Sequence, residues 1–160
     1  MSTARRLRIY VDTSVFGGYY DRVFAKETRS FFRLVRSRRI TAVVSDMVVG
    51  EISRAPGPVQ ALLREAIRLG AEESAAGEAS VELQEAYLKA GVLARRWEDD
   101  AMHVAMATLA RADAIASWNF RHLLDPRKTR EFNGVNVAMG YGLIAILSPT
   151  DIVRHMEGDE

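Results

Sequence analysis

The sequence contains no cysteine, and this absence excludes two classes of protein. A chain without cysteine has neither a disulfide framework of the kind that holds small secreted domains nor a thiolate metal site. It also has no apolar run long enough to span a bilayer. Its basic opening lacks the apolar stretch and the small-residue cleavage site of a signal peptide. We therefore expect a cytoplasmic protein that makes no membrane contact.

The chain also has little excess charge, with a formal net charge of +1, so the molecule as a whole is not a polycation. Nearly all of its basic residues are arginines, which contact phosphate in a bidentate manner and stack on bases. Arginine clusters are also common on solvated helix faces, and both interpretations stay open. The clusters are Arg5, Arg6 and Arg8; Arg33, Arg36, Arg38 and Arg39; Arg95 and Arg96; and Arg121, Arg127, Lys128 and Arg130.

The length suits one domain, which we place at residues 1–156, followed by a frayed tail at 157–160. Strand-like runs alternate with helical patterns, which predicts an α/β sandwich with a mainly parallel sheet. Gly17-Gly18 is expected to break the chain after the first strand. Strands are expected at 7–11, 40–44, 114–117 and 143–147, with a short strand or a loop near 71. Helices are expected at 25–38, after a cap at 45 or 46, and at 59–69, 81–90, 99–110 and 150–155, with a helix or loop leading to 133.

Polar residues follow several of these strands. Asp12 ends the first strand, Asn119 follows the strand at 114–117, and Glu51 lies on the helix that leaves the strand at 40–44. Sites in open α/β sheets form beyond the carboxyl ends of the strands. A fold that gathers Asp12, Glu51 and Asp100 makes an oxygen-lined pocket, which would hold Mg²⁺ or Mn²⁺. The leading hypothesis is therefore metal-dependent phosphodiester chemistry.

Each carboxylate also has a purely structural interpretation. Asp12 stands before Thr-Ser, where an aspartate often caps a helix N-terminus. Glu51 fits an exposed helix face, where it would pair with Arg54 or Arg36. These alternatives lose weight only because the acids occur together at the predicted edge of the sheet.

Asp99 and Asp100 open one helix, and adjacent helical residues point about 100° apart. We therefore predict that Asp99 is the N-cap and that Asp100 faces the pocket. His103 shares the face of Asp100 and either orients that carboxylate, a water or a phosphate, or packs in the core. Asn119 offers an amide oxygen to a metal or stabilises a turn, and Trp118 stacks on a base or belongs to the core.

These segments together resemble the PIN-domain family of metal-dependent nucleases, which includes the toxin halves of VapBC-type toxin–antitoxin pairs. The resemblance covers nearly the full chain. Its most specific parts surround Asp100 and Asn119. The matching segments are 9–14, Glu51, 100–105, 112–123 and 133–149.

The resemblance implies a three-layer α/β/α sandwich and a homodimer. It places Asp12, Glu51, Asp100 and Asn119 in the catalytic and metal-binding role, with Mg²⁺ or Mn²⁺ as the cofactor. Asn119 stands where many members have a fourth acid, which lowers the charge of the site. The implied function is a metal-dependent endoribonuclease acting on RNA. A cognate antitoxin is the implied partner, with an arginine or lysine inserted among the acids.

Two other α/β enzymes with an early aspartate fit poorly. A haloacid-dehalogenase-like phosphatase needs a second aspartate two residues after Asp12, where Ser14 stands. A receiver domain needs an acidic pair near the first strand and a lysine after the last, and the chain has neither. The alternative that stays open is a PIN-like scaffold that binds RNA or a protein without cutting.

Overall fold

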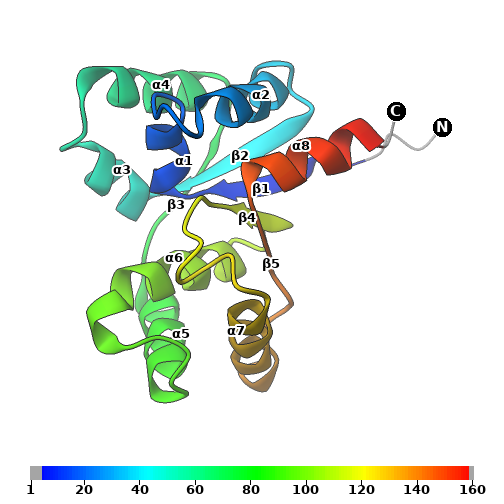
Figure 1. Cartoon of the computed structure of the whole chain (residues 1–160). Coiled ribbons are helices and arrows are strands. Elements are labelled where there is room, and N and C mark those ends of the chain that lie inside the picture. Colours follow the sequence, from blue (N-terminus) through cyan, green and yellow to red (C-terminus); the bar gives the residue numbers. More distant parts are fainter. Residues whose placement is uncertain (1–4, 159–160) are drawn as a thin grey trace.

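The structure is a computed structural model that describes residues 5–158, and it places a five-stranded sheet between two layers of helices (Figure 1). Every strand pair is parallel, and the strand order is β3-β2-β1-β4-β5. The predicted three-layer α/β/α fold with a parallel sheet is therefore confirmed. The strands are β1 (Leu7–Val11), β2 (Ile40–Ser45), β3 (Glu72–Ser74), β4 (Ala114–Ala116) and β5 (Ala145–Leu147).

The helices α1 to α4 cover one face of the sheet, and α5 to α7 cover the other (Figure 1). The last helix, α8, packs against α2. None of the described helices is both long and apolar enough to cross a membrane. Their bounds are α1 (Thr13–Gly18), α2 (Ala25–Arg36), α3 (Asp46–Ile52), α4 (Gly57–Arg68), α5 (Glu78–Lys89), α6 (Glu98–Leu109), α7 (Pro126–Ala138) and α8 (Pro149–Gly158), with a 3₁₀ turn at Arg95–Trp97.

The central strand β1 forms the middle of the core. Ile9, Tyr10 and Val11 are buried, because helices cover both faces of the sheet at this strand. A strand of a parallel sheet covered in this way is expected to be almost continuously apolar. The segment Ile9 to Val11 meets that requirement, with the hydroxyl of Tyr10 as the polar exception.

Several boundaries differ from the sequence predictions. Helix α1 was not predicted, because the pair Gly17-Gly18 indicated a break in the chain. β5 begins at Ala145, two residues later than expected, and α7 runs on to Ala138. The tail predicted at 157–160 overlaps helix α8, which continues through Gly158 with Ile152 buried. Residues 159 and 160 lie outside the described part of the chain.

β1 is the point in the sheet where the order of the strands changes side. From β1 it proceeds to β2 and β3 on one side, and it then crosses to β4 and β5 on the other. β1 and β4 are therefore neighbours, with Val11 paired to Ala116. Ligand sites of open α/β sheets lie outside the carboxyl ends of the strands at such a switch point. Asp12 and Ser117 are the first residues beyond these two strand ends.

A methyl group at Gly18 should destabilise the fold. An added Cβ would lie 2.7 Å from Nε1 of Trp118 and 3.0 Å from Oγ1 of Thr28. Overpacking of this kind costs about 1–3 kcal/mol, and we expect that loss for Gly18→Ala in urea unfolding.

Gly17→Ala is the matched control, because a Cβ there meets nothing within 4 Å. Alanine in a helix is about 0.5–1 kcal/mol more favourable than glycine, so this variant should be at least as stable as the natural chain. Equal stability of the two variants would contradict the packing argument.

Candidate functional site

Asp12 is buried at the switch point, and its carboxylate is held by two hydroxyl groups. Ser14 Oγ donates to Asp12 Oδ2 at 2.9 Å, and Ser117 Oγ donates to the same oxygen at 2.8 Å. Although Asp12 stands at the N-cap position of α1, its side chain makes no capping hydrogen bond. A buried carboxylate needs such hydrogen-bond donors, because moving its charge out of water without new hydrogen bonds costs free energy. Both donors bind Oδ2, so Oδ1 is the oxygen that faces His103.

His103, on α6, links three residues of the site. Its Nε2 lies 2.7 Å from Glu51 Oε1 and 3.7 Å from Asp12 Oδ1. Its Nδ1 lies 2.7 Å from the hydroxyl of Tyr10, which in turn lies 2.8 Å from Ser45 Oγ. A chain of hydrogen bonds therefore runs from the half-exposed Glu51 through the imidazole into the core.

The charges of the site act on the protonation of His103. Burial opposes its charged form, but the hydrogen bond to Glu51 and the negative charges of Asp12, Glu51 and Asp100 outweigh that effect and raise its pKa. Burial also raises the pKa of Tyr10, which stays a neutral phenol. When both ring nitrogens carry protons, Nε2 donates to Glu51 and Nδ1 donates to the Tyr10 hydroxyl.

Asp100 has a histidine partner of its own, which is His122 and not His103. Its Oδ2 lies 2.8 Å from Nδ1 of His122, whose ring packs on Trp97 with the ring centroids 4.3 Å apart. The prediction that Asp99 caps the helix is wrong. Helix α6 begins at Glu98 with Trp97 as its N-cap, because the 3₁₀ turn leads directly into it.

Asn119 shapes the loop that follows β4. Its Oδ1 accepts a hydrogen bond from the backbone N–H of His122 at 2.9 Å, and its carbonyl accepts from the N–H groups of Leu123 and Leu124. The turn-stabilising role that the sequence left open is therefore present. A role for Asn119 as a metal ligand stays a prediction.

The donor chemistry of the site suits a hard divalent cation, since carboxylate oxygens come from the end of β1, from α3 and from α6. Among residues 5–158, however, no group of three His, Cys, Asp or Glu side chains is arranged to hold a metal ion. Glu51 is bound to His103 and Asp100 to His122. The residues therefore fit a metal in kind, and an ion at this site would share these two carboxylates with the histidines or replace the histidines as their partners.

The two carboxylate–histidine pairs were missed in the sequence. The sequence placed His103 on the face of Asp100, but the partner of His103 lies 52 positions earlier, on α3. His122 lies in an irregular loop, where no periodicity predicts the direction of a side chain. The pairing of Glu51 with Arg36 is also absent, because Arg36 binds Glu65.

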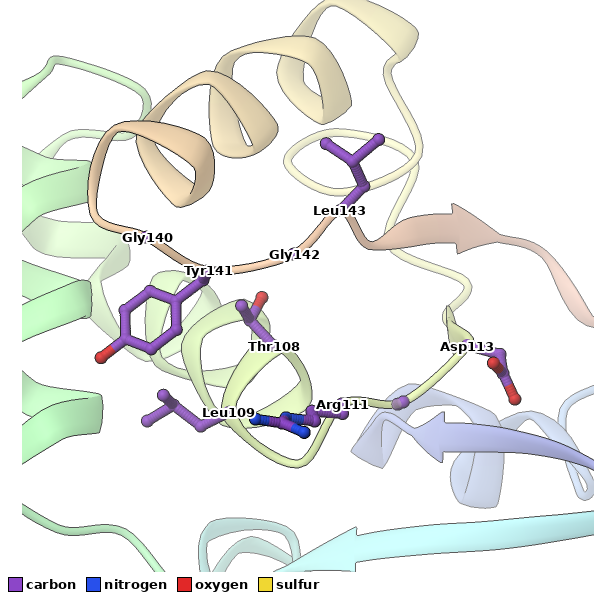
Figure 2. Close-up of a pocket in the computed structure, with 9 residues that line it drawn as sticks. Thr108, Leu109, Arg111, Asp113, Gly140, Tyr141, Gly142 and Leu143 are labelled. Atoms are coloured by element: carbon purple, nitrogen blue, oxygen red, sulfur yellow. The ribbon is translucent and has the colours of Figure 1, made fainter.

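A separate cavity of about 650 Å³ lies between the end of α6 and the loop Gly140–Leu143 (Figure 2). It opens at the amino end of β4, on the edge of the sheet opposite Asp12. Its lining includes Arg111, Asp113 and Tyr141. The Asp113 carboxylate already accepts from Arg5 and from the backbone of Arg8, so this cavity adds nothing to the acidic site.

No family model matches the sequence, and neither does any curated protein. A solved structure that matches is the crystal structure of VapBC2 from Rickettsia felis bound to a DNA fragment from their promoter. The TM-score is 0.56 at 12% sequence identity, and the match covers 89% of this chain and 98% of the chain in that complex. This match shows that the chain shares its fold with a chain of that complex, in agreement with the predicted α/β/α sandwich.

The raised pKa of His103 predicts a pH-dependent stability. Its pKa is higher in the folded than in the unfolded chain, so protonated His103 stabilises the fold fully below the unfolded value of about 6.5. This contribution is lost as the pH rises through the folded pKa. The difference in Tm between the natural chain and His103→Gln, measured in EDTA from pH 5.5 to 8.5, should therefore shrink with increasing pH. A constant or growing difference would show that the charges do not act as described.

Proposed function

We propose that this protein is a metal-dependent endoribonuclease that hydrolyses RNA phosphodiester bonds. The observation that carries the proposal is the geometry around His103, whose Nε2 lies 2.7 Å from Glu51 Oε1 and 3.7 Å from Asp12 Oδ1, with the negative charge of Asp100 also acting on this imidazole. Three carboxylates from three separate elements therefore act on one buried point. That point lies at the switch of a parallel sheet, which is the position of ligand sites in this fold class.

In this proposal Mg²⁺ or Mn²⁺ is held by Asp12, Glu51 and Asp100, with the amide oxygen of Asn119 as the fourth ligand. The ion supplies a water of lowered pKa and neutralises charge on the scissile phosphate. Carboxylate and amide oxygens are the ligand types that these two ions prefer.

The protein's own groups hold and orient the reactants. Ser14 and Ser117 fix the Asp12 carboxylate so that Oδ1 is directed toward His103 and Glu51. Asp100 is three-quarters buried and held by His122, which suits it to accept a proton from the attacking water. Loss of metal leaves Glu51 paired with His103, which limits the repulsion among the acids.

The surface around the site offers positive charge for an anionic substrate. Several arginines of the clusters are engaged in ion pairs with other carboxylates, including those of Arg36 with Glu65 and Arg127 with Asp125. Arg96 and Arg121, in contrast, flank the ring of Trp97 at 5.3 and 5.4 Å from its centroid. Trp97 packs on His122, and His122 binds Asp100, so a chain of contacts connects these two guanidinium groups to the acidic site.

The biological role that we propose is that of a toxin with a cognate antitoxin. The support is the fold shared with a chain of a VapBC2 complex. In this role the protein forms a homodimer and acts on cytoplasmic RNA. A small gene next to the coding sequence, whose product copurifies with this chain, is the expected companion.

Removal of a ligand carboxylate should abolish cleavage. We expect Asp12→Asn and Asp100→Asn to reduce the cleavage of labelled RNA in Mn²⁺ at least about a hundredfold, because a catalytic metal contributes several kcal/mol. Asp99→Asn is the matched control, since it makes the same change one residue from Asp100 on the exposed side of α6. Cleavage that survives in both ligand variants, or that continues in EDTA, would overturn the proposal.

Metal binding can be measured apart from cleavage. A ligand that binds the folded state at a hundred times its Kd stabilises it by about 2.7 kcal/mol, so Mn²⁺ should raise the Tm of the natural chain. Asp99→Asn should keep this shift and Asp100→Asn should lose most of it. A metal-induced shift without cleavage of any RNA would favour the non-cleaving scaffold, and no shift at all would contradict the metal site.

A further inference from the structure

Three aromatic side chains form a cluster beside the acidic site. We define this aromatic cluster as Phe24, Trp118 and Phe120. We propose that Phe120, at the surface of the cluster, is a stacking platform for an unpaired base of the nucleic-acid substrate. The inference rests on the proposed nuclease function and adds to it a base-binding position next to the reacting phosphate.

The rings of the cluster are close to parallel. The centroids of Phe24 and Trp118 lie 4.4 Å apart with 20° between the planes, and those of Phe24 and Phe120 lie 6.3 Å apart at 29°. Trp118 and Phe120 are separated by 6.2 Å at 36°. Phe24 and Trp118 are half-buried, whereas Phe120 is 59% exposed. Phe120 is thus the ring of the cluster that is most accessible to a second flat ring.

The cluster is held rigidly from behind. Trp118 Nε1 donates to Thr28 Oγ1 at 2.9 Å, and the missing side chain of Gly18 leaves the space that the indole edge occupies. Phe24 covers a face of the same indole. Because these contacts fix Trp118 and Phe24 before any ligand binds, the surface against which the Phe120 ring packs is preorganised.

The loop that carries Phe120 is also tied to the acidic site. The backbone N–H of Trp118 donates to Ser14 Oγ at 3.0 Å, and Ser14 binds the carboxylate of Asp12. Asn119 then closes the turn through the N–H of His122. Phe120 lies between these two anchored positions, so the loop that carries it is bonded to Asp12 through Ser14 and to Asp100 through His122.

The charge next to the platform favours a nucleic acid over a protein partner. Arg121 follows Phe120 in the chain and stands over Trp97 together with Arg96, and neither guanidinium has a carboxylate partner in the described part of the chain. An exposed phenyl ring followed in the chain by a guanidinium group without a carboxylate partner matches the chemistry of a base and its phosphate. A base in a duplex has both faces covered by its neighbours, so the platform selects unpaired nucleotides.

Binding is tested with a fluorescein-labelled ten-nucleotide single-stranded RNA, followed by anisotropy in EDTA. All proteins carry Asp12→Asn, which prevents the proposed cleavage and removes one repelling charge. We expect Phe120→Leu to weaken binding about tenfold, because base–aromatic stacking is worth that much or more. Phe120→Tyr keeps the ring face and should bind within about twofold of the parent. Leu143→Ala is the control, since Leu143 is exposed on the opposite edge of the sheet.

A strand of the same length with abasic sugars separates stacking from phosphate contacts. It should bind the parent and Phe120→Leu equally, because it has no base to stack. Equal affinity of both proteins for the normal RNA overturns the inference, and so does an equal loss for the two strands. If the normal strand binds no variant, the inference also fails, and the exposed ring is then assigned to a protein partner.

Cleavage in the chain that keeps Asp12 distinguishes this inference from the proposed function. There Phe120→Leu should raise the KM for RNA about tenfold and leave kcat nearly unchanged. An unchanged KM with intact cleavage would overturn the platform and leave the nuclease. Stacking seen in the binding experiment without cleavage by any protein would instead overturn the nuclease and keep the base-binding position.

Discussion

The hydrogen bond between Ser117 Oγ and Asp12 Oδ2 is the contact on which the site depends. It joins the residues that directly follow β1 and β4, and it does so where the backbone ladder between the two strands ends, at the bond from Asp12 N to Ala116 O. A buried carboxylate must be satisfied by donors. The presence of Asp12 therefore fixes the hydroxyl of Ser117, the hydroxyl of Ser14 and, through Ser14, the start of the loop that carries Trp118.

The second constraint is the concentration of negative charge at this edge of the sheet. In the described structure two of these carboxylates are hydrogen-bonded to histidines, Glu51 to His103 and Asp100 to His122. The raised pKa of His103 shows that the acids favour a positive charge at this point. In the proposed function, a bound metal ion and a proton on His103 each place positive charge next to the carboxylate of Glu51. The two therefore compete for that carboxylate.

The sequence predicts the fold well because the strands are strongly patterned. The run 7–11 alternates apolar and polar residues and is rich in β-formers, and the run 40–44 is apolar and flanked by polar residues. The structure has β1 and β2 there. Boundaries set by tertiary contacts were less predictable. Glycine has a low helix propensity, so Gly18 indicates a break in the chain. In the structure Gly18 lies in α1, and the indole of Trp118 occupies the space that a side chain there would fill. That contact joins positions 100 residues apart, and no local pattern reveals it.

The candidate site likewise has one part that the sequence predicts and another that depends on tertiary contacts. The position of Asp12 follows from the rule that parallel sheets place their sites at strand ends, and Glu51 and Asp100 follow from helices that begin near that edge. The same rule does not predict which side chains form hydrogen bonds with these acids. Helical spacing relates His103 to Asp100, but the direction of the ring depends on how α6 packs on the sheet. That packing turns Nδ1 toward Tyr10 and Nε2 toward Glu51.

The loop from Ser117 to His122 carries residues of both the acidic site and the aromatic cluster. Its alternate side chains serve different purposes, since Ser117 and Asn119 bind within the loop and the site, while Trp118 and Phe120 belong to the aromatic cluster. An amide at Asn119 suits this arrangement. It accepts the His122 N–H without adding a negative charge next to the carboxylate of Asp100, to which His122 is hydrogen-bonded. Asn119 thus fixes the turn by which Phe120 and His122 are placed.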